Sequence, residues 1–104
     1  MIKVLFVCLG NICRSPTAEG IFRHYLNSTH MRDKICVDSA GTSGWHVNDP
    51  PDQRAQMVAK TRGINLSELR SRRVNSADFE EFDYIVAMDQ QNLTDLLERC
   101  PSDR

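Results

Sequence analysis

The sequence MIKVLFVCLGNICRSP, residues 1–16, decides how this chain folds. Ile2 to Val7 is a continuous apolar run, rich in β-branched residues and with a single lysine, which is typical of a strand buried on both faces of a sheet. Ser15 and Pro16 then indicate the start of a helix, because serine can cap free N–H groups and proline fits the first helical position. The stretch therefore predicts a central strand, a short polar loop and a helix that ends near Asn27.

The rest of the chain alternates in the same way. We expect strands at 35–40 and 83–88, a helix that Asp52 caps and Gly63 stops, a short helix over 76–81, and a last helix that Pro101 ends. Strands that alternate with helices of about ten residues are typical of parallel sheets with right-handed crossovers. The expected fold class is α/β, a small doubly wound parallel sheet with helices on both faces.

The apolar pattern also predicts which side chains are buried. The strand at 83–88 is expected to be buried, and Cys36 and Cys100 fall on apolar faces that we assign to the core. Five side chains at helical spacing form the expected buried face of the first helix: Ala18, Ile21, Phe22, Tyr25 and Leu26.

Length and composition limit the possible classes of protein. A chain of 104 residues predicts one domain over 1–104, and 40% hydrophobic with 26% charged residues argues against disorder and coiled coil. The formal charge of −1 argues against a nucleic-acid surface. The longest early apolar run, Val4 to Leu9, is too short for a membrane span or a signal peptide. We therefore expect a cytoplasmic protein with free thiols, no membrane partner and, without a C-x2-C pair, no metal site.

The loop between the first strand and the first helix carries the residues with chemical potential. Parallel sheets bind ligands beyond the carboxyl ends of their strands, where loop N–H groups beside a helix N-terminus form an anion site. Cys8 begins this loop and Arg14 ends it with a planar fork suited to two phosphate oxygens. Such surroundings favour the thiolate form of a cysteine. The loop therefore predicts a nucleophile beside a bound phosphate.

A purely structural alternative exists for Cys8. Most free cysteines are small buried hydrophobic residues, and one at the end of a strand needs no further explanation. The combination of this cysteine with a five-residue gap, Arg14, Ser15 and Pro16 at a strand-to-helix turn favours the anion site instead.

Residues 7–16, VCLGNICRSP, resemble the signature of the low-molecular-weight protein tyrosine phosphatases. The resemblance covers essentially the whole chain, through the segments Asp38–Thr42, Trp45–Val47, Pro51–Ala55 and Ala87–Asp89. It implies that Cys8 is the nucleophile and that Arg14 binds the phosphate and the transition state. The implied phosphate-binding loop comprises Leu9, Gly10, Asn11, Ile12, Cys13 and Arg14.

The resemblance also implies supporting roles around this loop. Ser15 would donate a hydrogen bond to the thiolate, and Ser39 would hold Asn11 so that the loop keeps its strained shape. Cys13 would form a protective disulfide with Cys8. No cofactor is implied, and the expected ligands are phosphotyrosine-containing proteins and inorganic phosphate, sulfate or vanadate.

The sequence departs from the family at its other end. The family's general acid is an aspartate in an Asp-Pro-aromatic motif, and no such motif occurs before Arg104. We therefore expect a C-terminally incomplete domain that lacks the family's last strand and helix and acts weakly on phosphotyrosine. Asp89 follows a strand at the ligand edge and is the best substitute acid by topology, although the resemblance makes it a scaffold residue.

Other residues are expected near the rim of the site. Trp45 and His46 would form a wall of the substrate crevice, where an aromatic ring can stack on phosphotyrosine, although simple surface packing would also explain them. Arg70, Arg72 and Arg73 are expected to form a solvated basic face, with docking of acidic phosphopeptides as the alternative.

The predicted function is a cysteine-dependent phosphomonoesterase that works through a phosphocysteine. Three alternatives remain open at this point: a non-catalytic phosphate-binding or phosphotyrosine-binding module, an arsenate reductase of the same fold, and a related arginine phosphatase. The family's further redox cysteine pair is not visible after Asp83, which argues against the reductase. Ile12 argues against the arginine phosphatase, which usually has threonine there.

Overall fold

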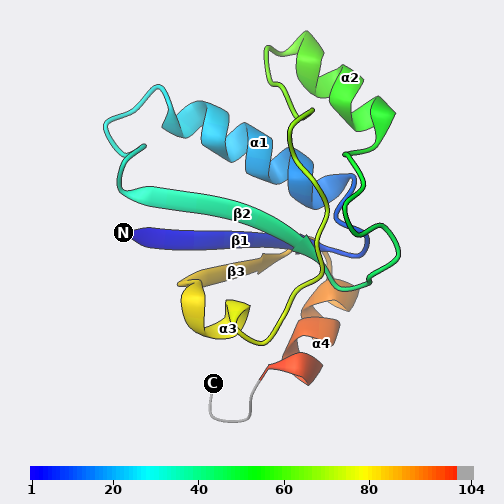
Figure 1. The fold of residues 1–104 in the computed structure, drawn as a ribbon. Helices are drawn as coiled ribbons and strands as arrows, with labels where there is room; N and C mark the ends of the chain where they lie inside the picture. The colour runs from blue at the N-terminus through cyan, green and yellow to red at the C-terminus, as the bar shows by residue number, and fades with distance from the viewer. Residues whose placement is uncertain (101–104) are drawn as a thin grey trace.

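A computed structural model describes residues 1–100 as a three-stranded parallel sheet with the strand order β2-β1-β3 (Figure 1). The elements in chain order are β1 (Ile2–Cys8), α1 (Arg14–Leu26), β2 (Ile35–Gly41), α2 (Gln53–Thr61), α3 (Asp78–Glu81), β3 (Tyr84–Ala87) and α4 (Gln90–Arg99). The predicted α/β class and the central position of the first strand are confirmed. The predicted helix stop at Pro101 lies outside the described residues.

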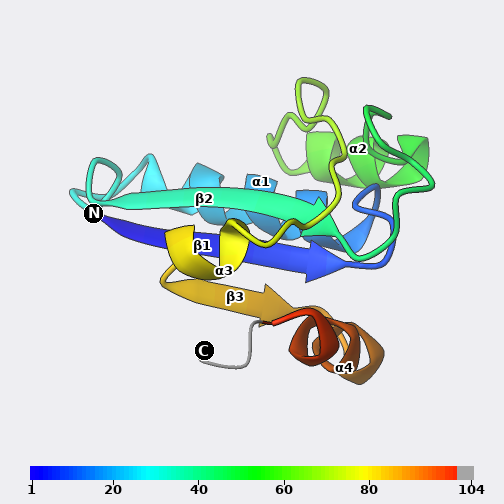
Figure 2. The same ribbon diagram turned by 60° about the horizontal axis from the view of Figure 1, so that its bottom comes forward.

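Helices lie on both sides of the sheet. In Figures 1 and 2, α1 runs along one face with α2 beside it, and α3 and α4 lie on the other side. The main core joins β1 to that second side, where Leu5 and Val7 of β1 pack with Phe79, Phe82 and Leu96. On the opposite face, Phe6 pairs with Phe22 of α1 at a ring separation of 5.8 Å. Alternate residues of β1 therefore supply both layers.

The start of α2 agrees with the sequence-based prediction, and the start of α1 differs from it. Asp52 caps α2 as predicted, since its carboxylate accepts the N–H groups of Arg54 and Ala55. The prediction that Ser15 caps α1 is wrong, because α1 begins at Arg14 and Ser15 lies inside its first turn. The serine hydroxyl is instead directed at Cys8.

The prediction that the third strand and Cys36 are buried is wrong. Tyr84 is 61% exposed, Val86 is 38% exposed, and Cys36 lies exposed on β2. The side chains of β3 are exposed because this strand lies at the edge of the sheet. Helix α1 packs on β1 and β2 and leaves this side of β3 uncovered. Cys100 packs against the core, as expected.

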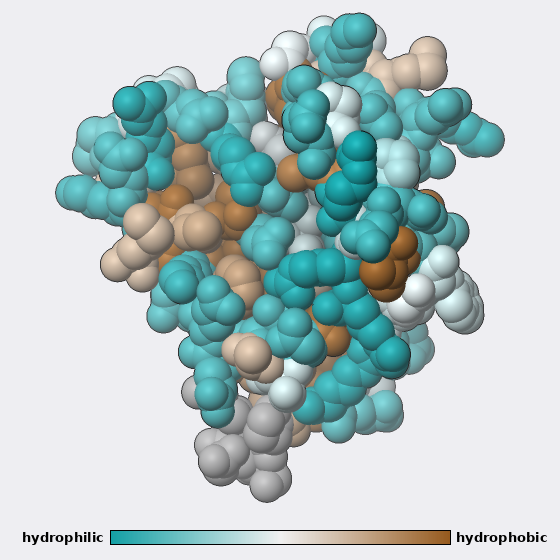
Figure 3. All heavy atoms as spheres, in the orientation of Figure 1, coloured by the Kyte–Doolittle hydropathy of each residue, from teal (hydrophilic) through white to brown (hydrophobic). Residues whose placement is uncertain are grey.

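The apolar face of α1 is only partly covered. Tyr25 is 65% exposed and Ile21 is 38% exposed, so the expectation that this whole stripe is buried is wrong. On the face of the molecule shown in Figure 3, the surface is mostly hydrophilic, with hydrophobic side chains gathered between α1 and β2. Within residues 1–100, no helix is long and apolar enough to cross a membrane.

Candidate active site

The loop from Cys8 to Arg14 lies at the carboxyl edge of the sheet, where the chain after β2 holds it. Thr42 and Ser43 donate their N–H groups to the carbonyl oxygens of Cys8 and Leu9, each at 2.9 Å. Gly41 permits this approach, because a Cβ atom at that position would lie 2.8 Å from the Leu9 carbonyl oxygen. The end of β2 therefore fixes the start of the loop.

The thiol of Cys8 is buried and surrounded by hydrogen-bonding groups. Its Sγ atom lies 3.0 Å from Ser15 Oγ and accepts the backbone N–H of Asn11 at 3.2 Å. Only 3% of Cys8 is exposed. A thiol that only filled a gap in the core would not need these two polar partners.

Asn11 holds the loop in an uncommon backbone conformation. Its φ of 57° lies in the left-handed region, which asparagine tolerates better than most residues. Its side-chain Nδ2 donates to Ser15 Oγ at 2.8 Å and to Ser39 Oγ at 2.9 Å, while its Oδ1 accepts the N–H of Arg72 at 2.9 Å. The whole amide of this buried residue is therefore used to fix the loop.

Within the described residues, the N–H groups of Gly10, Ile12 and Cys13 donate no hydrogen bond to another part of the protein. The carbonyl oxygens of Ile12 and Cys13, in contrast, accept from Asp52 and Thr17. Four of the loop's carbonyl oxygens thus accept from the surrounding chain while these three N–H groups stay free, which suits the binding of an anion.

Arg14 is the first residue of α1, and its side chain extends toward the end of β3. Its Nη1 donates to Asp89 Oδ2 at 2.8 Å. The other oxygen of Asp89 accepts the N–H of Asn92 at 2.8 Å and so caps α4. This capping bond, and then the bond from Arg14, lower the pKa of Asp89 below its ordinary value. Asp89 is therefore held as a carboxylate and is unsuited to the role of general acid.

The two residues expected at the rim differ in how they meet the loop. The ring of His46 packs against Gly10, with Cδ2 3.1 Å from the position of a Cβ on that glycine, and its Nδ1 lies 3.1 Å from Asp49 Oδ2. Trp45 is 79% exposed. Their role as a crevice wall stays a prediction.

The structure joins two further charged residues, Glu19 and Arg72, to this site. Glu19 of α1 is buried and accepts from Ser39. The prediction that Arg72 belongs to a solvated face is wrong, because its guanidinium pairs with Asp38 and with buried Asp78 while its N–H donates to Asn11. An acidic residue on a helix face that packs against the sheet was the available signal for Glu19.

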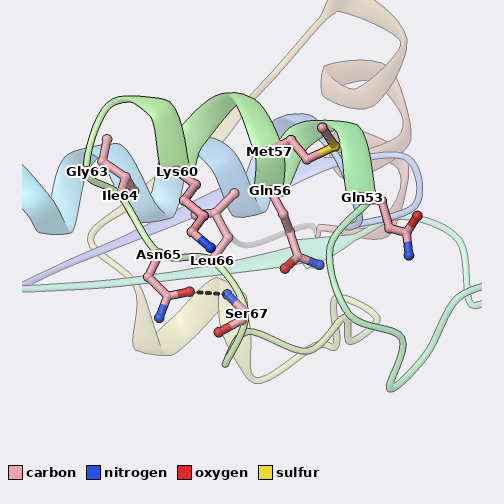
Figure 4. A pocket seen from close by; sticks show the side chains of 9 residues that line it. All are labelled: Gln53, Gln56, Met57, Lys60, Gly63, Ile64, Asn65, Leu66 and Ser67. Carbon is pink, nitrogen blue, oxygen red and sulfur yellow. Dashed lines mark hydrogen bonds between the residues drawn. The ribbon is translucent and has the colours of Figure 1, made fainter.

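One cavity lies away from this loop, between α2 and the segment that follows it (Figure 4). Its volume is about 740 Å³ and it is lined by Gln53, Gln56, Met57, Lys60, Gly63, Ile64, Asn65, Leu66 and Ser67. No cysteine, histidine or carboxylate is among these lining residues, so we place the candidate site at the Cys8 loop instead. Across residues 1–100, no three histidine, cysteine or acidic side chains gather as possible metal ligands.

Comparison with known proteins agrees with this geometry. The family model of the low molecular weight phosphotyrosine protein phosphatases matches residues 3–104. The chain is 50% identical over 94 residues to the human low molecular weight phosphotyrosine protein phosphatase, which covers 90% of this chain and 59% of the human protein. It is 48% identical over 96 residues to the low molecular weight protein-tyrosine-phosphatase YfkJ of Bacillus subtilis, covering 92% of this chain and 62% of that protein.

The fold comparison gives the same result. A crystal structure of a protein tyrosine phosphatase from Entamoeba histolytica, with Hepes in its active site, aligns with a TM-score of 0.94 and 47% identity. The alignment covers 99% of this chain and 65% of that chain. The chain therefore belongs to the low molecular weight phosphotyrosine protein phosphatase family. It spans 59% and 62% of the length of the human and bacterial relatives.

Proposed function

We propose that this chain is a cysteine-dependent phosphomonoesterase that acts on phosphotyrosine in proteins. The observation that carries the proposal is the Cys8 thiol, which meets Ser15 Oγ and the N–H of Asn11 in a loop that ends at Arg14. Membership of the phosphatase family supports the same function.

In this mechanism the Cys8 thiolate attacks phosphorus in line with the tyrosine ester bond. A P–S bond forms as the P–O bond to tyrosine breaks, and the bonding pair leaves with the phenol oxygen. The free loop N–H groups and the guanidinium of Arg14 stabilise the equatorial oxygens. Water then attacks the phosphocysteine, which releases inorganic phosphate and restores the thiolate. Inorganic phosphate, sulfate and vanadate should bind to the same loop.

Residues 1–100 offer no evident acid that could donate a proton to the leaving group. Residues 1–104 contain no Asp-Pro-aromatic sequence, and Arg14 and the cap of α4 hold Asp89 as a carboxylate. We expect the 104-residue chain to turn over phosphotyrosine slowly for this reason. A non-catalytic module that only binds phosphotyrosine is the second candidate, and the same observation favours it.

Turnover of an activated aryl phosphate by the 104-residue chain separates the two candidates. An enzyme should release the phenol slowly and gain the mass of one phosphoryl group on Cys8, whereas Cys8→Ser should do neither. Binding of the ester without phenol release and without a phosphorylated Cys8 would support the binding module. Reduction of arsenate with a thiol donor, or release of phosphate from phosphoarginine in preference to phosphotyrosine, would support the other members of this fold.

A further inference from the structure

A chain of four hydrogen bonds links a buried carboxylate to the nucleophile. Glu19, 3% exposed on α1, accepts from Ser39 Oγ at 2.6 Å, and Ser39 accepts from Asn11 Nδ2 at 2.9 Å. The same Nδ2 donates to Ser15 Oγ at 2.8 Å, and Ser15 Oγ lies 3.0 Å from Cys8 Sγ. Each member is buried, so water does not compete for these bonds.

The carboxylate of Glu19 and the N–H of Arg72 determine which group donates and which accepts in the hydrogen bonds of this chain. An ionised carboxylate only accepts, so Ser39 must donate to Glu19, and its oxygen is then the acceptor for Asn11. The N–H of Arg72 donates to Asn11 Oδ1, which turns the amide nitrogen of Asn11 toward both serines. Ser15 accepts one of these bonds and has a single proton of its own to give.

The remaining proton of Ser15 has two acceptors within reach. Cys8 Sγ lies 3.0 Å from Ser15 Oγ, and the carbonyl oxygen of Ala40 lies 3.5 Å away. The 3.5 Å contact is at the limit for a hydrogen bond, whereas 3.0 Å is short for a bond to sulfur, so the geometry directs the proton to the thiolate. A hydroxyl that donates to a thiolate stabilises its charge.

We propose that Glu19 is a positioning residue for the nucleophile, which acts through Ser39 and Asn11 to keep the Ser15 hydroxyl as a donor to Cys8. This inference rests on the proposed function because it takes Cys8 as the nucleophile. Burial raises the pKa of Glu19, while the bonds from Ser39 and Arg23 act in the opposite direction and nearby Asp38 adds to the increase. A surface ion pair with Arg23 alone would require neither the burial nor the 2.6 Å bond from Ser39.

Glu19→Gln tests this proposal because glutamine offers one acceptor where the carboxylate offers two. Ser39 and Arg23 both donate to Glu19, so either orientation of the new amide sets its NH2 group against a donor. The readout is the rate of alkylation of Cys8 by iodoacetamide as a function of pH, followed by peptide mapping so that the other three thiols do not interfere. We expect the pH midpoint to rise by about one unit, or about tenfold less thiolate at a pH below the midpoint.

A second substitution provides a rescue that a merely structural role does not predict. In the double variant Glu19→Gln with Arg23→Gln, residue 23 can accept, so the amide at 19 can turn its oxygen back to Ser39. The midpoint should return most of the way to that of the unchanged chain, and Arg23→Gln alone should shift it less than Glu19→Gln. Ser39→Ala should raise the pH midpoint of Cys8 alkylation as Glu19→Gln does. The double variant Ser39→Ala with Glu19→Gln should have the same midpoint as Ser39→Ala alone.

The outcomes separate this inference from the proposed function. An unchanged midpoint in both Glu19→Gln and Ser39→Ala, with folding checked by thermal unfolding, would overturn the role of Glu19 even if the chain hydrolyses aryl phosphates. If Glu19→Gln does not fold, an unchanged midpoint in Ser39→Ala still overturns the role of Glu19, because the proposed route to Asn11 passes through Ser39. A shifted midpoint in a chain that never forms a phosphocysteine would keep the role of Glu19 and overturn the phosphatase function instead.

Discussion

Asn11 is the residue on which the shape of the loop between Cys8 and Arg14 depends. It combines a left-handed φ of 57° with a buried side chain whose three hydrogen bonds reach α1, β2 and the segment before Val74. A glycine could adopt the same backbone but would lose all three bonds, and the buried serine oxygens would lose a donor. The loop therefore owes its geometry to a side chain as much as to its backbone.

At the residue scale, Arg14→Lys should weaken phosphate binding much more than it weakens the fold. Lysine keeps the charge but lacks the planar fork, so we expect at least about tenfold weaker binding. The ion pair with Asp89 is half exposed on both sides, so its loss should lower the melting temperature without phosphate by only a few degrees. Thermal unfolding with and without phosphate measures both. Equal phosphate-induced shifts in the two proteins would remove Arg14 from the anion site.

Oxidation by mild peroxide should be reversible only while Cys13 is present. Cys8, the nucleophile of the proposed function, is the expected target, and Cys13, which is exposed at the other end of the same loop, is the expected partner in a disulfide. Cys13→Ser should keep the activity but lose the recovery that a thiol reductant gives to the unchanged chain. Activity assays after reduction, with peptide mapping, check this. Finding Cys8 only as sulfonic acid in the unchanged chain would contradict the protective disulfide.

At the scale of elements, α1 packs closely against the segment after α2 through a glycine. A Cβ atom on Gly20 would lie 2.2 Å from Leu66 Cδ2, and Leu66 is almost fully buried with Ala59 and Ile64. Gly20→Ala gains about 1 kcal/mol of helix propensity but overpacks this contact by about 1–3 kcal/mol, so we expect a net loss of stability.

A double-mutant cycle identifies the cause of that loss. In a Leu66→Ala background the clash is absent, and Gly20→Ala should become neutral or stabilising. Denaturant unfolding of the four proteins gives the coupling free energy. An equal loss in both backgrounds would show that the contact with Leu66 does not limit residue 20.

The sequence predicted the elements well because their signals are local. The six-residue apolar run at Val4 and the capping carboxylate of Asp52 are recognisable without knowledge of the fold. Burial depends on which elements meet, so the apolar pattern that correctly predicts the strands of Tyr84 and Cys36 does not predict that both residues are exposed. The sequence predicts a cap at Ser15 because a capping serine and a serine directed at a thiol cannot be distinguished in sequence.

The candidate site likewise contains residues that the sequence predicts and residues that it does not. Cys8, Arg14 and the loop between them follow from a spacing visible in the sequence, and the resemblance to the family added Asn11, Ser15 and Ser39. The spacing and the resemblance did not include Glu19 and Arg72. Their contacts with Ser39 and Asn11 lie far along the chain, and only the position of Glu19 on the sheet-facing side of its helix gave a local signal. Long-range hydrogen bonds between polar side chains leave no periodic signal.

At the scale of the whole molecule, the polar network holds four separate segments around one thiol. The loop after β1, helix α1, strand β2 and the segment at Arg72 all contribute to it, and Asp89 joins the end of β3 to Arg14. Every carboxylate of this arrangement has an assigned donor. In the proposed function this site binds and transfers a phosphoryl group, but each of these acids accepts hydrogen bonds and none is free to protonate a leaving group.

The dependence of turnover on the leaving group should show this directly. The phenol of tyrosine has a pKa of about 10, and loss of a general acid costs roughly 10²- to 10⁴-fold for such a group, whereas more acidic phenols leave without a proton. Turnover of a series of aryl phosphates by the 104-residue chain should therefore fall steeply as the pKa of the phenol rises. Asp89→Asn, which keeps the cap of α4, should leave that slope unchanged because Asp89 is already ionised. A flat dependence that becomes steep in Asp89→Asn would show instead that Asp89 supplies the proton.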